Sequence, residues 1–223
     1  MKYIIHAYEK RMWYVNNFII PQLNEQDIKN KDILVWNDKF EVGCLDSCMQ
    51  LFATLPDNDE NICHLQDDIL ICQDFKKRVE KFKNFDGIVC GISVLPCEED
   101  NETGETNLDN MWWSFPCIII PNKFAKECSQ WFDSQINTPK HRNWIVRHRG
   151  DDAIFKYYLQ EKHPDVKIYN VIPNLANHID DLIGGGTCYN RKDLFRSRYW
   201  DDNERVEKLK RCIESRGKWI YGN

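Results

Sequence analysis

Short apolar runs alternate with helix-spaced apolar positions along most of the chain. The runs predict strands at Lys2–Ala7, Asp32–Trp36, Asn61–Leu65, Gly87–Leu95, Phe115–Ile120 and Lys167–Ile172. The helix-spaced patterns predict helices at Met12–Leu23, Gly43–Leu55, Phe75–Phe82, Pro121–Phe132, Asp151–Glu161 and Asn203–Ser215. This alternation indicates an α/β protein.

Prolines and one polar stretch refine these boundaries. Pro21 is expected to end or kink the first helix, because it has no N–H to donate and its ring clashes with the preceding turn. Pro121 instead suits the first turn of a helix. The acidic stretch EEDNETGETN, at positions 98–107, has the composition of a solvated or mobile loop.

Strands alternating with helices predict a central, mostly parallel and mixed sheet with helices on both faces. The chain has 223 residues, which suits one domain spanning residues 1–223. In such sheets ligands bind outside the carboxyl ends of the strands. Functional residues are therefore expected just after strands, at Tyr8, at Asn37–Asp38, at Gln66–Asp68 and near His178.

The composition is that of an ordinary soluble protein, with 42% apolar and 29% charged residues. A formal net charge of −5 argues against non-specific binding of nucleic acid or anionic membrane by the whole surface. The N-terminal segment is too polar for a signal peptide, and no apolar run approaches the roughly 18 residues of a membrane span. We therefore expect a cytoplasmic protein.

The ten cysteines are scattered, and several lie inside apolar runs. The closest pair, Cys44 and Cys48, has one-turn helical spacing but lacks a second pair at the distance typical of zinc sites. Buried, reduced thiols that act as small hydrophobic side chains are the better interpretation, and a cysteine metal site is not expected.

Two carboxylates, Asp67 and Asp68, interrupt an otherwise nearly continuous apolar run from Ile62 to Cys72. Burial of an unpaired carboxylate is costly, so both need a cation, hydrogen-bond donors or solvent. One interpretation is a surface turn between two short strands. The other is a strand end that presents oxygen ligands to Mn²⁺ or Mg²⁺, which then holds a diphosphate.

The segment HLQDDILICQDF, from His64 to Phe75, resembles the acidic metal-binding segment of GT-A-fold glycosyltransferases. The resemblance is greatest to the group of bacterial lipopolysaccharide galactosyltransferases and their viral relatives, and a viral source would place the protein in the host cytoplasm. Further segments resemble the same group in the same order: Arg11 after the first strand, WWSFPCIIIPNKF, GDDAIFKYYL and PNLANHIDDLIGGG. Gln66 departs from the pattern, because the group commonly has an acidic residue there.

The resemblance implies roles for these residues. Asp68 would bind the divalent cation that bridges the donor diphosphate, and His178 would be a further metal ligand or a diphosphate partner. Asp67 would orient the ribose or the sugar, and Gln66 can still hydrogen-bond the ribose. The full set of expected donor-binding residues is Tyr8, Arg11, Asp38, Gln66, Asp67, Gly185, Arg191 and Arg198.

Asp151 and Asp152 open a helical pattern, where one aspartate suffices to cap the helix. The second is free for chemistry, and we expect Asp152, with Asp151 as the alternative, to be the general base that activates the acceptor hydroxyl. Trp113 is a candidate for stacking on an acceptor sugar, although large aromatic residues that flank a strand more often belong to the core.

Two further segments could contact phosphates. The run Lys140–Arg149 is strongly basic, and either a solvated loop or an anion-binding surface explains it. The glycines Gly184–Gly186 would let backbone amides approach a phosphate or let a loop close over the donor, and a plain flexible loop is as good an account.

The leading hypothesis is a glycosyltransferase that uses a nucleotide-sugar donor, most simply a UDP-sugar, and a divalent cation. Its acceptor hydroxyl could belong to a glycan, a glycoconjugate or a modified nucleic acid. A nucleotidyltransferase is disfavoured, because Ala7–Arg11 has no glycine-rich loop. A non-catalytic carbohydrate- or nucleic-acid-binding module would leave the two carboxylates in the apolar run unexplained.

Overall fold

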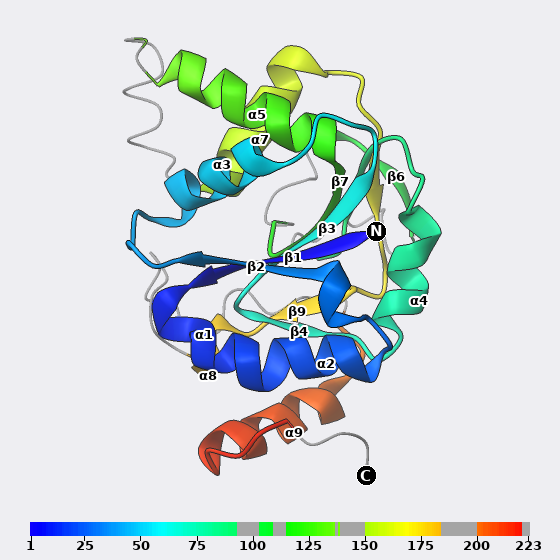
Figure 1. Ribbon diagram of the computed structural model, residues 1–223. Coiled ribbons are helices and arrows are strands. Elements are labelled where there is room, and N and C mark those ends of the chain that lie inside the picture. The colour runs from blue at the N-terminus through cyan, green and yellow to red at the C-terminus, as the bar shows by residue number, and fades with distance from the viewer. Residues whose placement is uncertain (93–102, 109–114, 137, 139–149, 184–199, 220–223) are drawn as a thin grey trace.

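The computed structural model describes residues 1–92, 103–108, 115–136, 138, 150–183 and 200–219. A seven-stranded sheet in the order β2-β1-β3-β7-β5-β8-β6 forms its centre (Figure 1). The strands are β1 (Lys2–Tyr8), β2 (Ile33–Asp38), β3 (Asn61–Gln66), β5 (Ile88–Cys90), β6 (Gly104–Thr106), β7 (Cys117–Pro121) and β8 (Ile168–Asn170). The register makes five strands parallel, with β7 and β6 reversed. The mostly parallel, mixed sheet is therefore confirmed.

Helices cover both faces of this sheet (Figure 1). One face carries α3 (Cys44–Thr54), α5 (Asn122–Gln135) and α7 (Asp151–Lys162). The other face carries the first helical segment, α4 (Phe75–Val79) and α9 (Asn203–Glu214). Apolar side chains on the two sides of each strand fill a separate core under each helical layer.

A second, two-stranded sheet lies on the face with the first helix. It pairs β4 (Ile69–Ile71) with β9 (Ala176–His178) in antiparallel register, and the short helix α8 (Asp180–Ile183) follows. This small sheet places His178 and the residues around it beside the turn that follows β3. The sequence pattern did not predict it, because three-residue strands are too short to show alternation.

Of the two alternatives expected at Pro21, an end or a kink of the helix, the first is wrong, because the helical segment continues past Pro21 and is irregular just before it. A 3-10 turn (Glu9–Arg11) leads into α1 (Met12–Tyr14), and a π-helical turn (Val15–Ile19) connects α1 to α2 (Ile20–Glu25). Ile20 donates its backbone N–H five residues back to Val15. Pro21 then stands in the first turn of α2, where a missing N–H is tolerated. The carbonyl of Asn17, four residues before Pro21, accepts a hydrogen bond from the Trp219 N–H at 3.3 Å.

Other elements of the structure differ in detail from those predicted. Part of the expected acidic loop is the edge strand β6, which pairs with β8. Pro121 is the residue before α5 and not its first residue. The 3-10 turns Asn30–Asp32 and Glu80–Phe82 precede β2 and extend α4. Six of the described cysteines are buried free thiols, as expected, but Cys44 is exposed.

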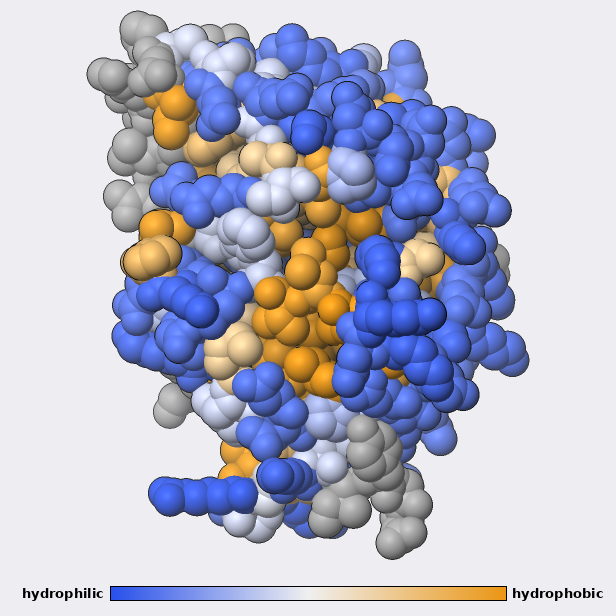
Figure 2. Space-filling view, viewed as in Figure 1, coloured by the Kyte–Doolittle hydropathy of each residue, from blue (hydrophilic) through white to orange (hydrophobic). Residues whose placement is uncertain are grey.

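The edge strand β2 borders an apolar surface in the middle of Figure 2. Within β2, Leu34 is 46% exposed, and its neighbours Ile33 and Val35 are half-buried. In the part of the chain that the structure describes, no helix is both long and apolar enough to cross a bilayer.

Candidate active site

The carboxyl ends of β1 and β3 lie side by side, because the two strands pair in parallel with His6 opposite Gln66. The turn after β3 carries Asp67 and Asp68. The small sheet pairs Ile69 with His178, and the backbone N–H of Ile179 donates to the Asp68 carbonyl at 2.8 Å. Segments more than a hundred residues apart in sequence therefore meet at one edge of the sheet.

The Arg11 side chain joins three carboxylates at this edge. One terminal nitrogen donates to Oδ1 of Asp67 at 3.0 Å and to Oδ2 of Asp68 at 2.9 Å. The other terminal nitrogen pairs with Asp180. Arg11, Asp67 and Asp68 are each at most 5% exposed, so this is a buried ion cluster and not a surface turn. The backbone N–H of Tyr8 fixes the second oxygen of Asp67 at 2.6 Å.

The two aspartates titrate differently. Burial and the neighbouring Asp68 raise the pKa of Asp67 to about 6, against the opposing effect of Arg11. Burial also opposes ionisation of Asp68, but His178 and Arg11 outweigh it and hold the Asp68 pKa below its usual value. The Asp68 carboxylate is therefore the member of the pair that stays charged.

His178 contacts the same carboxylate. Its Nε2 lies 3.2 Å from Oδ2 of Asp68. Burial lowers the pKa of His178, and the charge of Asp68 and the hydrogen bond to it raise the pKa by more, so the net shift is upward. His178 is the last residue of strand β9 and so belongs to the small sheet.

The residues around Asp68 suit a hard cation. Oδ1 of Asp68 is buried and has no hydrogen-bond partner among the described residues. A buried carboxylate oxygen in this state could bind Mn²⁺ or Mg²⁺. The guanidinium of Arg11 already neutralises part of the carboxylate charge here, so a cation would have to share Asp68 with Arg11. Asp68 and His178 could supply two ligands; neither of the groups of three or more ligand atoms within 4.8 Å in the described part of the chain includes Asp68. Further ligands would come from water or from a bound diphosphate.

Asp151 forms a second polar centre, on the opposite face of the sheet. Its Oδ2 accepts a hydrogen bond from the Gln66 amide at 2.8 Å and from the Cys44 thiol at 3.1 Å. Burial and the neighbouring charge of Asp152 raise the pKa of Asp151 to about 7. A carboxyl group with this pKa can both accept and release a proton near neutral pH.

Asp152 lies beside it at the start of α7. Gly150 is the residue before the helix, so neither aspartate is the N-cap that the sequence suggested. Asp152 Oδ1 accepts the N–H of Ala153 at 2.7 Å, and burial raises the pKa of Asp152. A Cβ at Gly150 would lie 2.3 Å from Oδ1 of Asp152, so glycine leaves the space that this carboxylate occupies.

Asp38, expected at the donor site, has its carboxylate engaged by its own loop. It accepts the backbone N–H groups of Val42 at 3.1 Å and Gly43 at 3.2 Å, which shapes the turn before α3. The remaining expected residues lie outside the described part of the chain: Trp113, the basic run 140–149, the glycines 184–186 including Gly185, Arg191 and Arg198.

Sequence reasoning missed several residues of this region. Asp180 pairs with Arg11 and stands two residues after His178, inside the segment already quoted for the family resemblance. His6 and His64 lie on the sheet face that packs against α3, and burial lowers their pKa values to about 4 and about 3. Period-two alternation places both histidines on the face of Ile4 and Ile62, which was the available signal.

No family model matches the chain, and no curated protein matches it. Among solved structures, TarS residues 1–349 of S. aureus is 13% identical, with a TM-score of 0.50 over 77% of this chain and 58% of that one. The fold is GT-A-like. The galactosyltransferase LgtC is 10% identical with a TM-score of 0.43, covering 93% and 94% of the two chains. A putative glucose-1-phosphate thymidylyltransferase of Bacillus anthracis is 12% identical with a TM-score of 0.46, covering 80% and 89%.

These similarities concern the fold only, because the sequence identities are low. Within the GT-A-like fold, Asp67 and Asp68 follow the third strand of the sheet counted from the β2 edge, and His178 is brought back to them by β9. The comparisons therefore show a GT-A-like fold, and the chemistry of this chain has to be argued from its own residues.

Proposed function

We propose that this protein transfers a sugar from a nucleotide-sugar donor to an acceptor hydroxyl with the help of Mn²⁺ or Mg²⁺. The observation that carries the proposal is Asp68. Its carboxylate is buried at the carboxyl end of β3, is charged and contacts His178, and its Oδ1 has no partner among the described residues. Asp68 and His178 would hold the cation, which when bound stabilises negative charge on the leaving diphosphate.

The residues around Asp68 suit the donor nucleotide. Arg11 offers a cationic side chain next to the diphosphate position, and Asp67 holds Arg11 in place while it accepts the N–H of Tyr8. The partly exposed Gln66 presents its amide toward the sugar side, beside Asp151. We take a UDP-sugar as the donor, because the sequence segments around these residues resemble those of galactosyltransferases with the GT-A fold.

The aspartates of α7 suit the acceptor. In the reaction the bond between the sugar C1 and the diphosphate oxygen breaks, a bond from C1 to the acceptor oxygen forms, and the acceptor proton leaves. We assign that proton to Asp152, with Asp151 as the alternative base. Burial raises the pKa of both carboxyl groups, which makes each a stronger proton acceptor than an ordinary aspartate. The acceptor is a glycan, a glycoconjugate or a modified nucleic acid.

Donor hydrolysis tests the proposal without knowledge of the acceptor, because water can replace the acceptor hydroxyl. A panel of nucleotide sugars is incubated with the full chain, with and without Mn²⁺, and nucleoside diphosphate release is measured. Release should require Mn²⁺ and should disappear in Asp68→Asn. The matched control is Asp74→Asn, an exposed aspartate six residues later whose only described ion pair is a 3.8 Å contact with Arg78.

Two outcomes would overturn the proposal. One is a folded wild-type protein that hydrolyses none of the donors and binds no nucleoside diphosphate with Mn²⁺. The other is pyrophosphate release from a nucleoside triphosphate and a sugar phosphate, which would make the protein a nucleotidyltransferase.

A further inference from the structure

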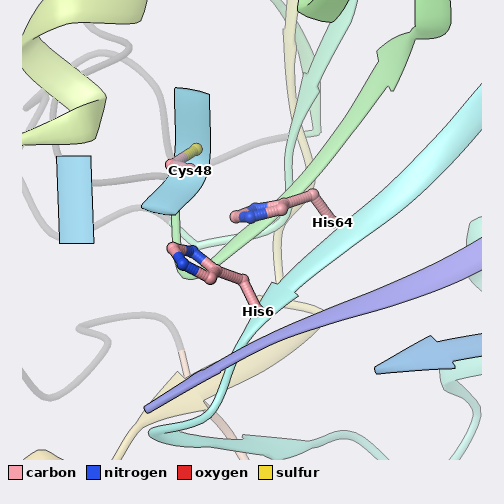
Figure 3. Close-up of side chains that lie close together, drawn as sticks. All are labelled: His6, Cys48 and His64. Atoms are coloured by element: carbon pink, nitrogen blue, oxygen red, sulfur yellow. The ribbon is translucent and has the colours of Figure 1, made fainter. Parts of the chain in front are cut away.

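Three buried side chains with metal-binding atoms converge on the sheet face opposite Asp68. They are His6 of β1, His64 of β3 and Cys48 of α3, and their ligand atoms all lie within 4.8 Å of one another (Figure 3). The residues are 6%, 0% and 0% exposed, respectively. The two imidazole rings face a common space next to the thiol, and their centroids are 5.8 Å apart.

One ligand atom in this space lacks a partner. Nε2 of His64 is fully buried and has no hydrogen bond within the described residues. The other ring nitrogen, Nδ1, lies 3.3 Å from the carbonyl oxygen of Phe115. A hydrogen bond from Nδ1 to a backbone carbonyl is the usual second contact of a metal-bound histidine, and it leaves the Nε2 lone pair directed at the ion.

The ligand chemistry selects the ion. Two imidazoles and one thiolate suit Zn²⁺ or Co²⁺, whereas the carboxylates beside Arg11 suit Mn²⁺ or Mg²⁺. The ligand atoms around a tetrahedral zinc ion lie about 3.3–3.6 Å from one another. The ligand atoms of His6, Cys48 and His64 lie within 4.8 Å of one another, so these distances would have to shorten by about 1.5 Å or less. Nε2 of His6 shares a 2.9 Å hydrogen bond with the Ser47 hydroxyl, so His6 would bind the ion through Nδ1 or give up this bond, and water would be the fourth ligand.

We propose that His6, Cys48 and His64 bind a zinc-type transition-metal ion between the sheet and α3. The ion would link the two adjacent strands that carry Tyr8 and Gln66 to the helix that carries Cys44. It would be a structural centre, separate from the cation proposed at Asp68, and its existence does not depend on the transferase reaction. Aromatic packing of His64 against Phe52 and Phe115 alone is the competing explanation.

Cobalt reports thiolate ligation directly, because a bond from cysteine sulfur to Co²⁺ gives a near-ultraviolet charge-transfer band that oxygen and nitrogen ligands do not give. The full chain, reduced and stripped with a chelator, is titrated with Co²⁺. We expect this band and tetrahedral visible bands to saturate at one equivalent, and Zn²⁺ to abolish both. The Asp68→Asn variant should give the same spectrum, because Asp68 belongs to the other site.

The matched pair of variants is Cys48→Ser and Cys44→Ser. Both cysteines lie in α3, one turn apart, and Cys44 instead contacts Asp151. Cys48→Ser should lose the charge-transfer band, and Cys44→Ser should keep it. His64→Gln should weaken Co²⁺ binding at least tenfold, with circular dichroism as the check on folding.

A wild-type titration without a sulfur-to-cobalt band would overturn the proposal, and this result needs no variant to fold. A band that survives in Cys48→Ser and disappears in Cys44→Ser would also overturn it, since the thiolate would then belong to the group of His6, Cys44 and Asp151.

Discussion

Replacement of Arg11 by methionine tests the electrostatics of the carboxylate cluster. The substitution keeps much of the buried apolar stem and removes the charge that pairs with Asp67, Asp68 and Asp180. Two of these carboxylates are 5% exposed and would be left without their cation. Removal of one partner from a buried ion pair costs about 3–5 kcal/mol of folding free energy. In a protein of this size, that corresponds to a fall in melting temperature of roughly 6–20 °C.

Mn²⁺ should then restore part of the lost stability, because a divalent cation can take over the charge that Arg11 supplied. An ion present at a hundred times its dissociation constant adds about 2.7 kcal/mol if it binds only the folded state. We therefore expect Mn²⁺ to raise the melting temperature of Arg11→Met more than that of the wild type. Differential scanning calorimetry with and without Mn²⁺ measures both effects.

Arg205→Met is the matched control. Arg205 is also largely buried, and it contacts the Ile71 carbonyl, Glu25 and the Trp219 ring instead of the Asp67–Asp68 pair. Its loss should destabilise the protein without recovery in Mn²⁺. The reasoning is wrong if Arg11→Met costs less than about 1 kcal/mol, or if Mn²⁺ stabilises both variants equally.

Three further predictions concern the two polar centres. His178→Ala should weaken Mn²⁺ binding at least about tenfold in titration calorimetry, because loss of even an indirect metal contact costs about 10–100-fold; unchanged affinity would remove His178 from the site. Because burial and Asp152 raise the pKa of Asp151 from 3.8 to about 7, the folded state binds more protons, and the wild type should lose stability as pH rises from about 4 to about 7. In urea unfolding, the free energy of unfolding of Asp151→Asn relative to that of the wild type should rise by up to about 4 kcal/mol between these two pH values. The same difference at both pH values would contradict a raised pKa of Asp151. Gly150→Ala should displace the Asp152 carboxylate, lowering donor-to-acceptor transfer while leaving Mn²⁺ affinity unchanged, and equal transfer rates would show that Asp152 tolerates the move.

The sequence predicted the features whose cause is local. The buried strand β7 is an almost purely apolar run, β3 is apolar at Ile62, Cys63 and Leu65, and the helices show helical spacing of apolar residues. The acidic turn after β3 was found because carboxylates inside such a run need a special environment. These signals gave the fold class and the place of the candidate site at the carboxyl end of a strand.

The rest depends on distant pairing. Strand β9 has the sequence Ala-Asn-His, which shows no alternation, and it exists because β4 offers it a partner. The pairing of Arg11 with Asp180 spans 169 residues, so no local pattern announces it. His6, Cys48 and His64 likewise come from three elements, and only the fold brings them together.

Pro21 was expected to end or kink the first helix, and only the end of the helix at this residue is ruled out. A π-helical turn precedes the proline, and the carbonyl of Asn17 accepts a hydrogen bond from the backbone N–H of Trp219. Helix propensity describes a residue within its own helix. It cannot include the contact that Trp219, far away in the sequence, makes with Asn17.

That contact also bears on how the chain folds during synthesis. The Trp219 indole donates to Glu25 at 3.2 Å, and 194 residues separate the two. A ribosome adds about 5–20 residues each second, so about 10–40 s pass between the appearance of the first helical segment and that of its partner. During this interval the nascent α2 lacks its contacts with Trp219 and α9. The hydrophobic core on this face of the sheet is complete only after α9 has left the exit tunnel.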